Sequence, residues 1–368
     1  MLFDPRPKQE KRDLFGRERE LNRLLAAMGS RCPLILLLGV RRIGKTSLLK
    51  VALKEAGQPY IYLDLRILEE EGYSRVALYR LLSEELSRLH SAWKRLGEFV
   101  RKVRGVEIAG VRIELDWGSR GLMLSSLLKA LNEWVEREKK SSYLTLALDE
   151  AQLLRNMVGG KGRIDFRSLL AYSYDNLPNL KFILTGSEVG LLMDFVGAEN
   201  PASPLYGRYR EEIVLEGFDD ETALSFLEKG FREQKLKVER ELLEEAVRRL
   251  DGVVGWLAYY GYRVSQERKP NGQLLNAIFE EAKAMASKEL EKIFQRSRYY
   301  RLVLRALGMG EGSWASIKRS VEAWTGKPVG NAQITRLLEN LVKLGIIRRG
   351  DRGYQIVDPI IREAAKHY

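Results

Sequence analysis

One eight-residue segment constrains the fold of this chain more than any other. Residues 39–46 read GVRRIGKT, which matches the pattern G-x-x-x-x-G-K-[ST] at every fixed position. The segment follows a buried apolar run, PLILLL, and precedes a run with helical spacing, TSLLKVALKEAG. A strand, a glycine-rich turn and a helix in this order are typical of a loop whose backbone N–H groups surround phosphate. The pattern therefore predicts a phosphate-binding loop, and around it an α/β fold.

The fixed residues of this loop each have a chemical role. Gly39 and Gly44 let the backbone turn tightly, and Lys45 brings a positive charge to the β- and γ-phosphates. The Thr46 hydroxyl is a ligand for Mg²⁺. The whole loop and the residue after it are expected to contact the nucleotide: Gly39, Val40, Arg41, Arg42, Ile43, Gly44, Lys45, Thr46 and Ser47.

Two further strands end in polar residues. Residues 143–150 read YLTLALDE, an apolar run that ends in Asp149 and Glu150. Because ligands of α/β sheets bind at the carboxyl ends of the strands, we expect Asp149 to hold Mg²⁺ and Glu150 to deprotonate the attacking water. Thr185 follows the run KFIL and is expected to sense the γ-phosphate or to hold the water; an ordinary turn is the alternative. Asp64 and Gln152 are either helpers or local caps.

The alternation of apolar runs with helical segments predicts a parallel sheet with helices on both faces. A stretch at about residues 90–121 interrupts the alternation, and its residues 106–117 have the pattern of a hairpin. The expected strands are Pro33–Leu38, Tyr60–Leu63, Tyr143–Leu148, Lys181–Leu184 and Glu212–Leu215.

The strands stop after Gly217, and the rest of the chain reads as two further domains. Helical spacing predicts a helical domain over residues 218–296, with helices at 218–234, 239–250, 256–267 and 271–294. Residues 297–368 read as three helices, at 297–308, 313–325 and 331–344, followed by two short strands within 346–357. Three helices and a hairpin are typical of a winged helix. The first 217 residues then form the nucleotide-binding domain.

The winged-helix segment is strongly basic. It carries 13 Lys and Arg against 6 Asp and Glu, a net charge of +7. This charge favours duplex DNA as a partner, although winged helices also serve as protein-docking modules. The third helix would then be the recognition helix, and the two strands would form the wing. The expected DNA contacts are Asn331, Gln333, Arg336, Arg348, Arg349 and Arg352, with Thr335 and Lys343 nearby.

Composition excludes several classes of protein. The single Cys32 rules out a disulfide framework and a cysteine-built zinc site, and two histidines, His90 and His367, make a histidine metal site a poor fit. No apolar run approaches the roughly 20 residues of a membrane span. The charged N-terminus lacks the apolar core of a signal peptide, so we expect a cytoplasmic protein. The net charge of the chain is +12, which favours an anionic partner.

Three more segments carry a family resemblance. They read FGRERELNRLL at 15–25, SPLYGRYREEIVLEGF at 203–218 and DGVVGWLAYYG at 251–261. With the two carboxylates and the phosphate loop, they resemble the archaeal ATPase family of the STAND class, which is related to AAA+ proteins. The resemblance implies that the helical domain of residues 218–296 is a helical lid. It also implies ATP or ADP as ligand, with Gly16 and Arg17 near the adenine, and an arginine that reaches the γ-phosphate. Arg208 is favoured for that role over Arg210.

The chain departs from the family pattern at one position. The lid motif of the family has proline where this chain has Val254, which puts contact between the lid turn and the base in doubt. The leading interpretation is a slow ATPase that acts as a nucleotide-dependent switch on the winged helix. A second is an AAA+-like oligomer that remodels DNA or loads a partner, with an arginine supplied across a subunit interface. A third is a DNA-binding regulator in which the nucleotide is structural.

Overall fold

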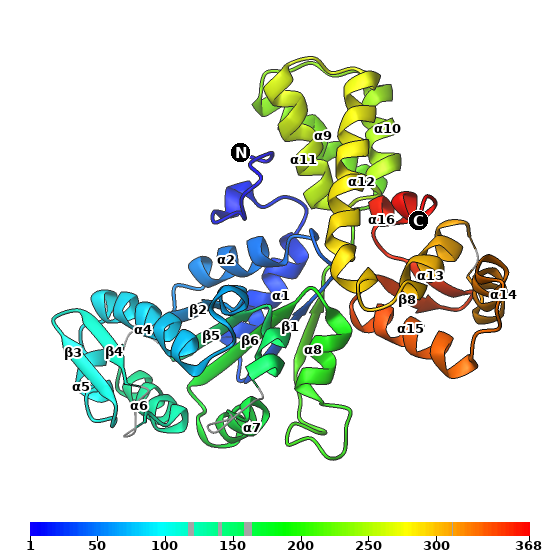
Figure 1. Cartoon of the computed structure of the whole chain (residues 1–368). Coiled ribbons are helices and arrows are strands. Elements are labelled where there is room, and N and C mark those ends of the chain that lie inside the picture. Colours follow the sequence, from blue (N-terminus) through cyan, green and yellow to red (C-terminus); the bar gives the residue numbers. More distant parts are fainter. Residues whose placement is uncertain (117–120, 139–141, 158–163, 311) are drawn as a thin grey trace.

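The structure is a computed structural model that describes residues 1–116, 121–138, 142–157, 164–310 and 312–368. Figure 1 shows an α/β domain at one end, a helical bundle above it and a small third domain beside both. In the described residues, no helix is both long and apolar enough to cross a membrane.

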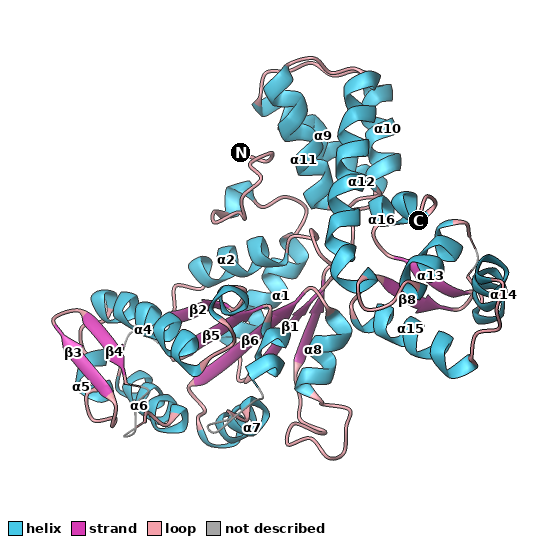
Figure 2. Ribbon diagram, viewed as in Figure 1, coloured by secondary structure: helices cyan, strands magenta, loops and turns pink. Residues whose placement is uncertain are grey.

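A five-stranded parallel sheet forms the centre of the α/β domain (Figure 2). The strand order is β2-β5-β6-β1-β7, so β1 lies between β6 and β7, the last two strands of this sheet in sequence order. All five predicted strands are confirmed to within a residue or two. Their bounds are Leu34–Leu38 for β1, Tyr60–Asp64 for β2, Leu144–Asp149 for β5, Leu180–Gly186 for β6 and Glu211–Val214 for β7.

Helices cover both faces of the sheet because β1 is apolar at every position. Leu36 points into one hydrophobic cluster, whereas Ile35 and Leu37 point into the other. The second cluster is closed by α1 (Glu18–Gly29) and α2 (Lys45–Glu55). The first is closed by α4 (Arg75–Ala92), α6 (Leu124–Arg137), α7 (Phe166–Asn176) and α8 (Val189–Val196), with the short elements α3 (Ile67–Glu71), α5 (Leu96–Val100) and η2 (Ala151–Met157) nearby.

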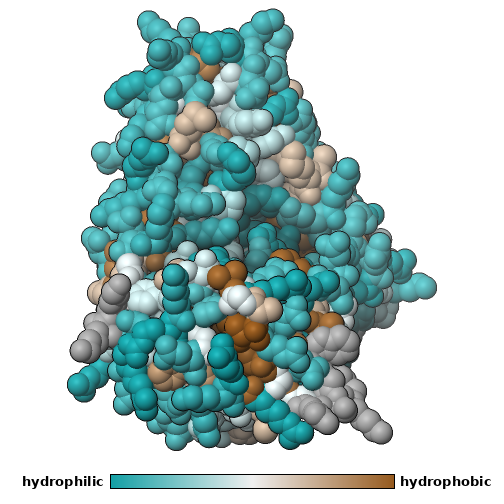
Figure 3. Space-filling view, turned by 90° about the vertical axis from the view of Figure 1, so that its left-hand side faces the viewer, coloured by the Kyte–Doolittle hydropathy of each residue, from teal (hydrophilic) through white to brown (hydrophobic). Residues whose placement is uncertain are grey.

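The predicted hairpin of the insertion is confirmed. Strands β3 (Val106–Ala109) and β4 (Arg112–Leu115) pair antiparallel around Gly110, which has φ 62°. The hairpin is anchored on α4, where the Ser87 hydroxyl accepts a hydrogen bond from the Ile113 N–H at 2.8 Å. Trp117, at the predicted end of the hairpin, lies outside the described residues. Figure 3 views the molecule from this side and shows a mostly hydrophilic surface with one hydrophobic area in its lower half.

Four helices follow the sheet as predicted. The N-terminal residue Phe3 inserts between two of them, because Gly230 and Gly261 leave space for its ring: a Cβ on either glycine would lie 2.2 Å or 2.4 Å from it. The chain start, which includes η1 (Lys11–Asp13), is therefore tied to the lid. The four helices are α9 (Asp220–Glu233), α10 (Arg240–Leu250), α11 (Val254–Glu267) and α12 (Gly272–Phe294).

The last domain is a winged helix with one element that the sequence did not predict. Three helices and a hairpin occur where they were expected, and α16 (Pro359–Ala365) follows them. Asp358 caps α16 by accepting hydrogen bonds from Ile360 N and Ile361 N. The predicted elements are α13 (Tyr299–Gly308), α14 (Trp314–Thr325), α15 (Asn331–Lys343), β8 (Ile347–Gly350) and β9 (Gly353–Ile356).

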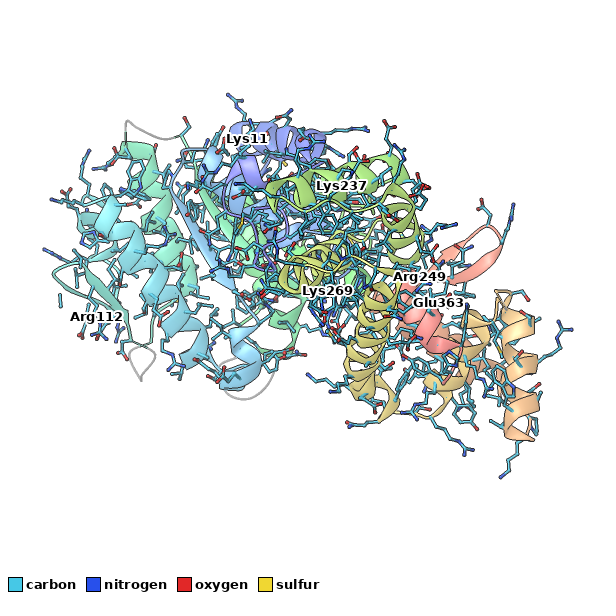
Figure 4. The ribbon with its side chains drawn as sticks, turned by 90° about the horizontal axis from the view of Figure 1, so that it is seen from above. Lys11, Arg112, Lys237, Arg249, Lys269 and Glu363 are labelled. Carbon is cyan, nitrogen blue, oxygen red and sulfur yellow. The ribbon has the colours of Figure 1, made fainter. Side chains whose placement is uncertain are left out.

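The lid and the winged helix share one hydrophobic cluster. Helix α16 lies against α10 and α12, and its Arg362 pairs with Asp251, just after α10, at 3.4 Å. Figure 4 shows the winged helix beside the lid helices, with Arg249 of α10 and Glu363 of α16 labelled. The predicted domain limits at residues 217 and 296 both fall between secondary-structure elements. They stay a prediction, because the hydrophobic cluster of the lid continues past residue 296 into the winged helix.

Candidate nucleotide-binding and hydrolysis site

The loop of residues 39–44 joins β1 to α2 in the conformation that its glycines allow. Gly39 has φ 152° and Gly44 has φ 99°, values that favour glycine. A Cβ on Gly39 would lie 2.8 Å from the backbone oxygen of Leu215, so the close approach of the two chains also requires glycine. Because α2 begins at Lys45, the unpaired N–H groups of its first turn face the loop. The arrangement is an anion-binding helix terminus.

Lys45 is buried at this terminus. Its ammonium donates hydrogen bonds to Gly39 O at 2.7 Å and Val40 O at 2.8 Å. Burial lowers the pKa of Lys45 to about 8, although the nearby carboxylates of Glu150 and Asp149 act in the opposite direction. The lysine is therefore a charge that an additional anion would stabilise.

Asp149 binds three hydroxyl groups at the carboxyl end of β5. Thr46 and Tyr62 donate to its Oδ2, each at 2.9 Å, and Thr185 donates to its Oδ1. The carboxylate is 1% exposed. Thr46 and Asp149 thus lie side by side, and hydroxyl and carboxylate oxygens are the ligands that Mg²⁺ prefers. The described residues include no cluster of three or more His, Cys, Asp or Glu, so a metal here would depend on further ligands such as phosphate.

Glu150 adopts a left-handed backbone conformation, with φ 58°. Its Oε2 accepts hydrogen bonds from Ser187 N and Ser187 Oγ, both at 2.9 Å, and from Gln152 Nε2 at 2.6 Å. Burial raises the pKa of Glu150. The hydrogen bonds from Gln152 and Ser187, helped by Lys45, outweigh this effect and hold the pKa below its ordinary value. The carboxylate is therefore ionised near neutral pH and able to accept a proton.

Thr185 and Gln152 also lie in this site. Thr185 accepts a hydrogen bond from Glu150 N at 3.3 Å, in addition to its bond with Asp149. Its role toward the γ-phosphate stays a prediction. Asp64, by contrast, binds the backbone N–H and the guanidinium of Arg66, which fits the local cap that was the alternative for this residue.

Gly16 and Arg17 lie beneath the loop rather than in an open pocket. Arg17 is 6% exposed, and its guanidinium donates to Glu216 O at 2.6 Å and to Ile43 O at 3.3 Å. Gly16 faces the start of α9, where a Cβ would lie 2.9 Å from the side chain of Thr222. Arg17 therefore stabilises the phosphate loop through its hydrogen bond to Ile43 O. Contact of Gly16 and Arg17 with adenine stays a prediction.

The other loop residues differ in exposure. Ile43 is buried, Val40 is half-buried and Arg41 is exposed. Ser47, in the first turn of α2, accepts a hydrogen bond from Lys8 N at 3.0 Å. The N-terminal segment is thus held against the first turn of α2.

The lid turn lies directly on the phosphate loop. Arg42 O accepts a hydrogen bond from Gly255 N at 2.8 Å, and the Arg42 guanidinium lies 4.1 Å from the centre of the Trp256 ring. Arg42 also forms an ion pair with Glu289 of α12. Val254, which replaces the family proline, packs here too: a Cβ on Gly44 would lie 3.5 Å from its Cγ1. The lid therefore meets the loop through residues 254–256 and through Glu289.

Arg208 lies at the opposite edge of the sheet. It precedes β7, whose first residue Glu211 pairs with Ile35 near the start of β1. The phosphate loop begins at Gly39, at the other end of β1, which is four residues from Ile35 and so about 13 Å away at about 3.3 Å per residue. Arg208 forms an ion pair with Asp175, and Arg210 pairs with Glu212. The expectation that either arginine reaches a γ-phosphate bound by its own chain does not fit this placement; contact with nucleotide on a second copy stays a prediction.

Two residues of the site were not assigned from the sequence. Tyr62 reaches Asp149 because β2 pairs with β5, with Leu63 opposite Leu148. Ser187 binds Glu150 although its neighbour Thr185 was the predicted sensor. The polar run after KFIL was the available signal for Ser187, but the run alone does not indicate which hydroxyl faces the glutamate.

The predicted DNA-contact residues lie on the surface of the winged helix. The Asn331 side chain accepts a hydrogen bond from Lys318 Nζ at 2.8 Å, and Thr335 accepts one from Trp314 Nε1 at 3.2 Å, so α14 supports the start of α15. Lys343, at the far end of α15, instead pairs with Asp194 of α8 at 2.8 Å. The six predicted DNA contacts are all exposed: Asn331, Gln333 and Arg336 on α15, and Arg348, Arg349 and Arg352 on the wing.

Comparison with known proteins identifies the family. The family described as an ATPase domain predominantly from Archaea matches residues 14–259, well over half of the 368-residue chain. The chain belongs to this archaeal ATPase family. Residues 294–357 of the chain match the C-terminal winged helix-turn-helix domain of MCM proteins. The comparison with curated proteins gives no match.

Two solved structures are similar to this chain over its whole length. A Walker-type ATPase of Pyrococcus abyssi is 37% identical, with 100% of both chains covered and a TM-score of 0.84. The ORC2 protein of Aeropyrum pernix, solved in complexes with ADPNP and ADP, is 17% identical, with 100% of this chain and 96% of that chain covered and a TM-score of 0.64. The first supports the family and the second the fold, a P-loop sheet with a C-terminal winged helix.

Proposed function

We propose that this protein binds ATP with Mg²⁺, hydrolyses it slowly, and uses the ATP and ADP states to switch the position of a DNA-binding winged helix. The observation that carries the proposal is the convergence of Lys45, Thr46, Asp149 and Glu150 at one edge of the sheet, beside a helix N-terminus. These groups supply the charge, the metal ligands and the base that phosphoryl transfer to water requires. The family supports the ATPase assignment, and the STAND class is part of the proposal.

In hydrolysis, the oxygen of a water attacks the γ-phosphorus, the bond from that phosphorus to the β–γ bridging oxygen breaks, and ADP leaves. Glu150 accepts the proton of the water. Its Oε2 already accepts three hydrogen bonds, so Oε1 is the oxygen suited to this role. Lys45 and the first turn of α2 stabilise the negative charge on the phosphates. Glu150 thus acts on the water, whereas Lys45 acts on the nucleotide in the ground state as well.

Thr46 and Asp149 would hold Mg²⁺. When bound, the ion neutralises charge on the phosphate oxygens and orients them for attack. Tyr62 and Thr185 donate hydrogen bonds to the same carboxylate, so they fix its orientation.

The lid connects this chemistry to the winged helix. Arg42 of the loop stacks on Trp256, and the indole N–H of Trp256 donates to both carboxylate oxygens of Asp358, at 3.2 Å and 3.0 Å. Asp358 caps the last helix of the winged helix. A change in the conformation of the phosphate loop would therefore be transmitted to the winged helix through Trp256 and Asp358. The difference in binding free energy of ATP and ADP between the two arrangements supplies the free energy of the switch.

The hydrolysis proposal is tested by phosphate release with two variants. Lys45→Ala is expected to abolish tight nucleotide binding, because it removes the charge at the phosphates. Glu150→Gln is expected to bind ATP like the wild type and to lose hydrolysis, because the amide cannot accept the proton. Unchanged hydrolysis in Glu150→Gln would show that another group is the base. Binding without any hydrolysis in the wild type would instead favour a structural nucleotide.

The DNA-binding proposal rests on the exposed basic side chains of α15 and the wing. If about four phosphates are neutralised, log K falls against log salt with a slope of about −4, at roughly −0.9 per phosphate. The Arg349→Ala, Arg352→Ala double variant of the full chain is expected to make this slope shallower on every DNA sequence. Asn331→Ala is expected to change sequence preference instead. No binding by the full chain at low salt, with ATP or without it, would identify the winged helix as a protein-docking module.

The placement of Arg208 favours a second candidate function, an AAA+-like oligomer. Arg208 lies at the sheet edge opposite its own phosphate loop and is half-buried, so it serves hydrolysis only if a second copy presents its nucleotide there. Such an enzyme would assemble with ATP and remodel DNA or load a partner. Size measurement by light scattering, with and without ATP, distinguishes the assembly from the single-chain switch.

A further inference from the structure

The winged helix touches the α/β domain next to the residue that holds Glu150. Helix α8 begins at Val189, two residues after Ser187, and the end of α15 packs against it. This contact is separate from the route through Trp256 and Asp358, because it lies at the end of β6 and reaches the glutamate rather than the phosphate loop.

Two glycines, one in each domain, form the contact. A Cβ on Gly190 of α8 would lie 2.6 Å from Lys343 Cα and 3.1 Å from Lys343 O. A Cβ on Gly345, just after α15, would lie 3.0 Å from Ser187 O, and Gly345 has φ 67°. The two backbones therefore meet with no side chain between them. At the rim of the contact, Lys343 and Asp194 form an ion pair at 2.8 Å.

A contact of this kind transmits displacement. Where two side chains touch, a small displacement can be absorbed by a change of rotamer. Where two backbones touch, it cannot, because no rotatable side chain lies between them. Ser187 is 5% exposed and binds Glu150 through both its N–H and its hydroxyl, each at 2.9 Å. A shift of the winged helix at Gly345 therefore reaches the Glu150 carboxylate through a single residue.

We propose that docking of the winged helix on α8 positions Ser187, and through it Glu150, so that hydrolysis reaches its full rate only when the winged helix is docked. Ser187 is a positioning residue in this scheme, since it acts on the glutamate and not on the nucleotide. The inference rests on the proposed function, because it requires that Glu150 accept the proton of the water. A ligand that displaces the winged helix from α8 would therefore slow ATP turnover.

The test measures ATP turnover and ADP affinity of full-length variants with matched controls. Gly345→Ala places a methyl group against Ser187 O, whereas Gly326→Ala introduces the same backbone strain, at φ 65°, with no atom within 4 Å. Gly190→Ala approaches Lys343, whereas Gly272→Ala, also in the first turn of a helix, meets nothing within 4 Å. The two pairs probe one contact from opposite domains, so the test remains if one variant fails to fold.

We expect Gly345→Ala and Gly190→Ala each to lower kcat about tenfold, because small misplacement of a general base is costly. KM for ATP and the affinity for ADP should stay within about twofold, since the phosphate loop is not altered. Ser187→Ala, which removes one of the two bonds to Glu150 and leaves docking intact, should also lower kcat with KM unchanged. Gly326→Ala and Gly272→Ala should turn over ATP at the wild-type rate.

Other results would overturn the inference. Wild-type kcat in both folded contact variants would show that docking does not position Glu150, and parallel losses in kcat and ADP affinity would show a general structural defect. If the wild-type rate did not exceed that of Glu150→Gln, the proposed function itself would fail. A wild-type rate well above that background, together with unaffected contact variants, would refute this inference alone.

Discussion

The buried ammonium of Lys45 predicts how nucleotide affinity depends on pH. Burial lowers its pKa from 10.5 to about 8. A bound phosphate favours the charged form, so binding above pH 8 requires uptake of a proton. The sign follows: affinity is highest where Lys45 is already protonated, and it falls as pH rises through the pKa of the free protein.

The size of the effect follows from the same pKa. With a value of about 8, roughly three quarters of the Lys45 side chains are protonated at pH 7.5 and about 3% at pH 9.5. If the bound phosphate keeps the lysine protonated across this range, the affinity for ADP falls about 25-fold, or about 1.9 kcal/mol.

Calorimetric titration of ADP into the protein at several pH values measures this dependence. The range above pH 7.5 is suitable because a terminal phosphate with a pKa of about 6 is fully ionised there. Lys45→Arg is the control, since arginine keeps its charge throughout the range.

Two results would refute the reasoning. An ADP affinity that is constant from pH 7.5 to 9.5 would mean that the pKa of Lys45 is not lowered, so the two loop carbonyls and the carboxylates offset its burial completely. The same loss of affinity in Lys45→Arg would mean that another group titrates.

Three further substitutions have defined outcomes. Arg208→Ala is expected to leave ADP affinity unchanged and to slow hydrolysis only at concentrations where the protein self-associates; a loss that is independent of concentration would contradict contact between copies. Trp256→Phe removes the indole N–H that donates to both carboxylate oxygens of the buried Asp358. This should cost about 1.5–3 kcal/mol, measured as faster hydrogen exchange in α16; unchanged exchange would mean that the capped helix does not depend on the indole. Gly252→Ala would put a Cβ 1.9 Å from the carbonyl oxygen of Phe218, so the lid should unfold at a much lower temperature. Gly57→Ala is the control, because Gly57 also has positive φ but a Cβ there meets no atom within 4 Å. It should lower the free energy of unfolding by only about 1 kcal/mol. Equal thermal midpoints in the two glycine variants would show that the close contact is not important.

Local patterns in the sequence were sufficient for most of the secondary structure. The phosphate loop, the five strands and the helices of the lid were predicted because each is specified by glycine spacing or hydrophobic periodicity within 10 to 20 residues. The placement of Asp149 and Glu150 beside the loop also followed from the sequence. The carboxyl ends of parallel strands meet at one edge, whatever the detailed register.

Helix α16 was not predicted because it lacks such a local pattern. It has only seven residues, starts with Pro359 and is buried on more than one side, so it has no amphipathic period to detect. Its stability comes from packing against the lid, which no local pattern records.

The contacts that define the site and its coupling depended on the tertiary structure. The sequence placed Arg208 before a strand, but only the pairing of Glu211 with Ile35 shows that this end of β7 lies opposite the phosphate loop. Ser187 is separated from Gly345 by more than 150 residues, and their contact exists because two independently patterned domains pack against each other. The hydrophobic periodicity of a helix predicts which of its faces is buried, because the residues of one face lie three or four positions apart in the sequence. Which element covers that face depends on the packing free energy of the whole chain, and it is decided only when the chain has folded.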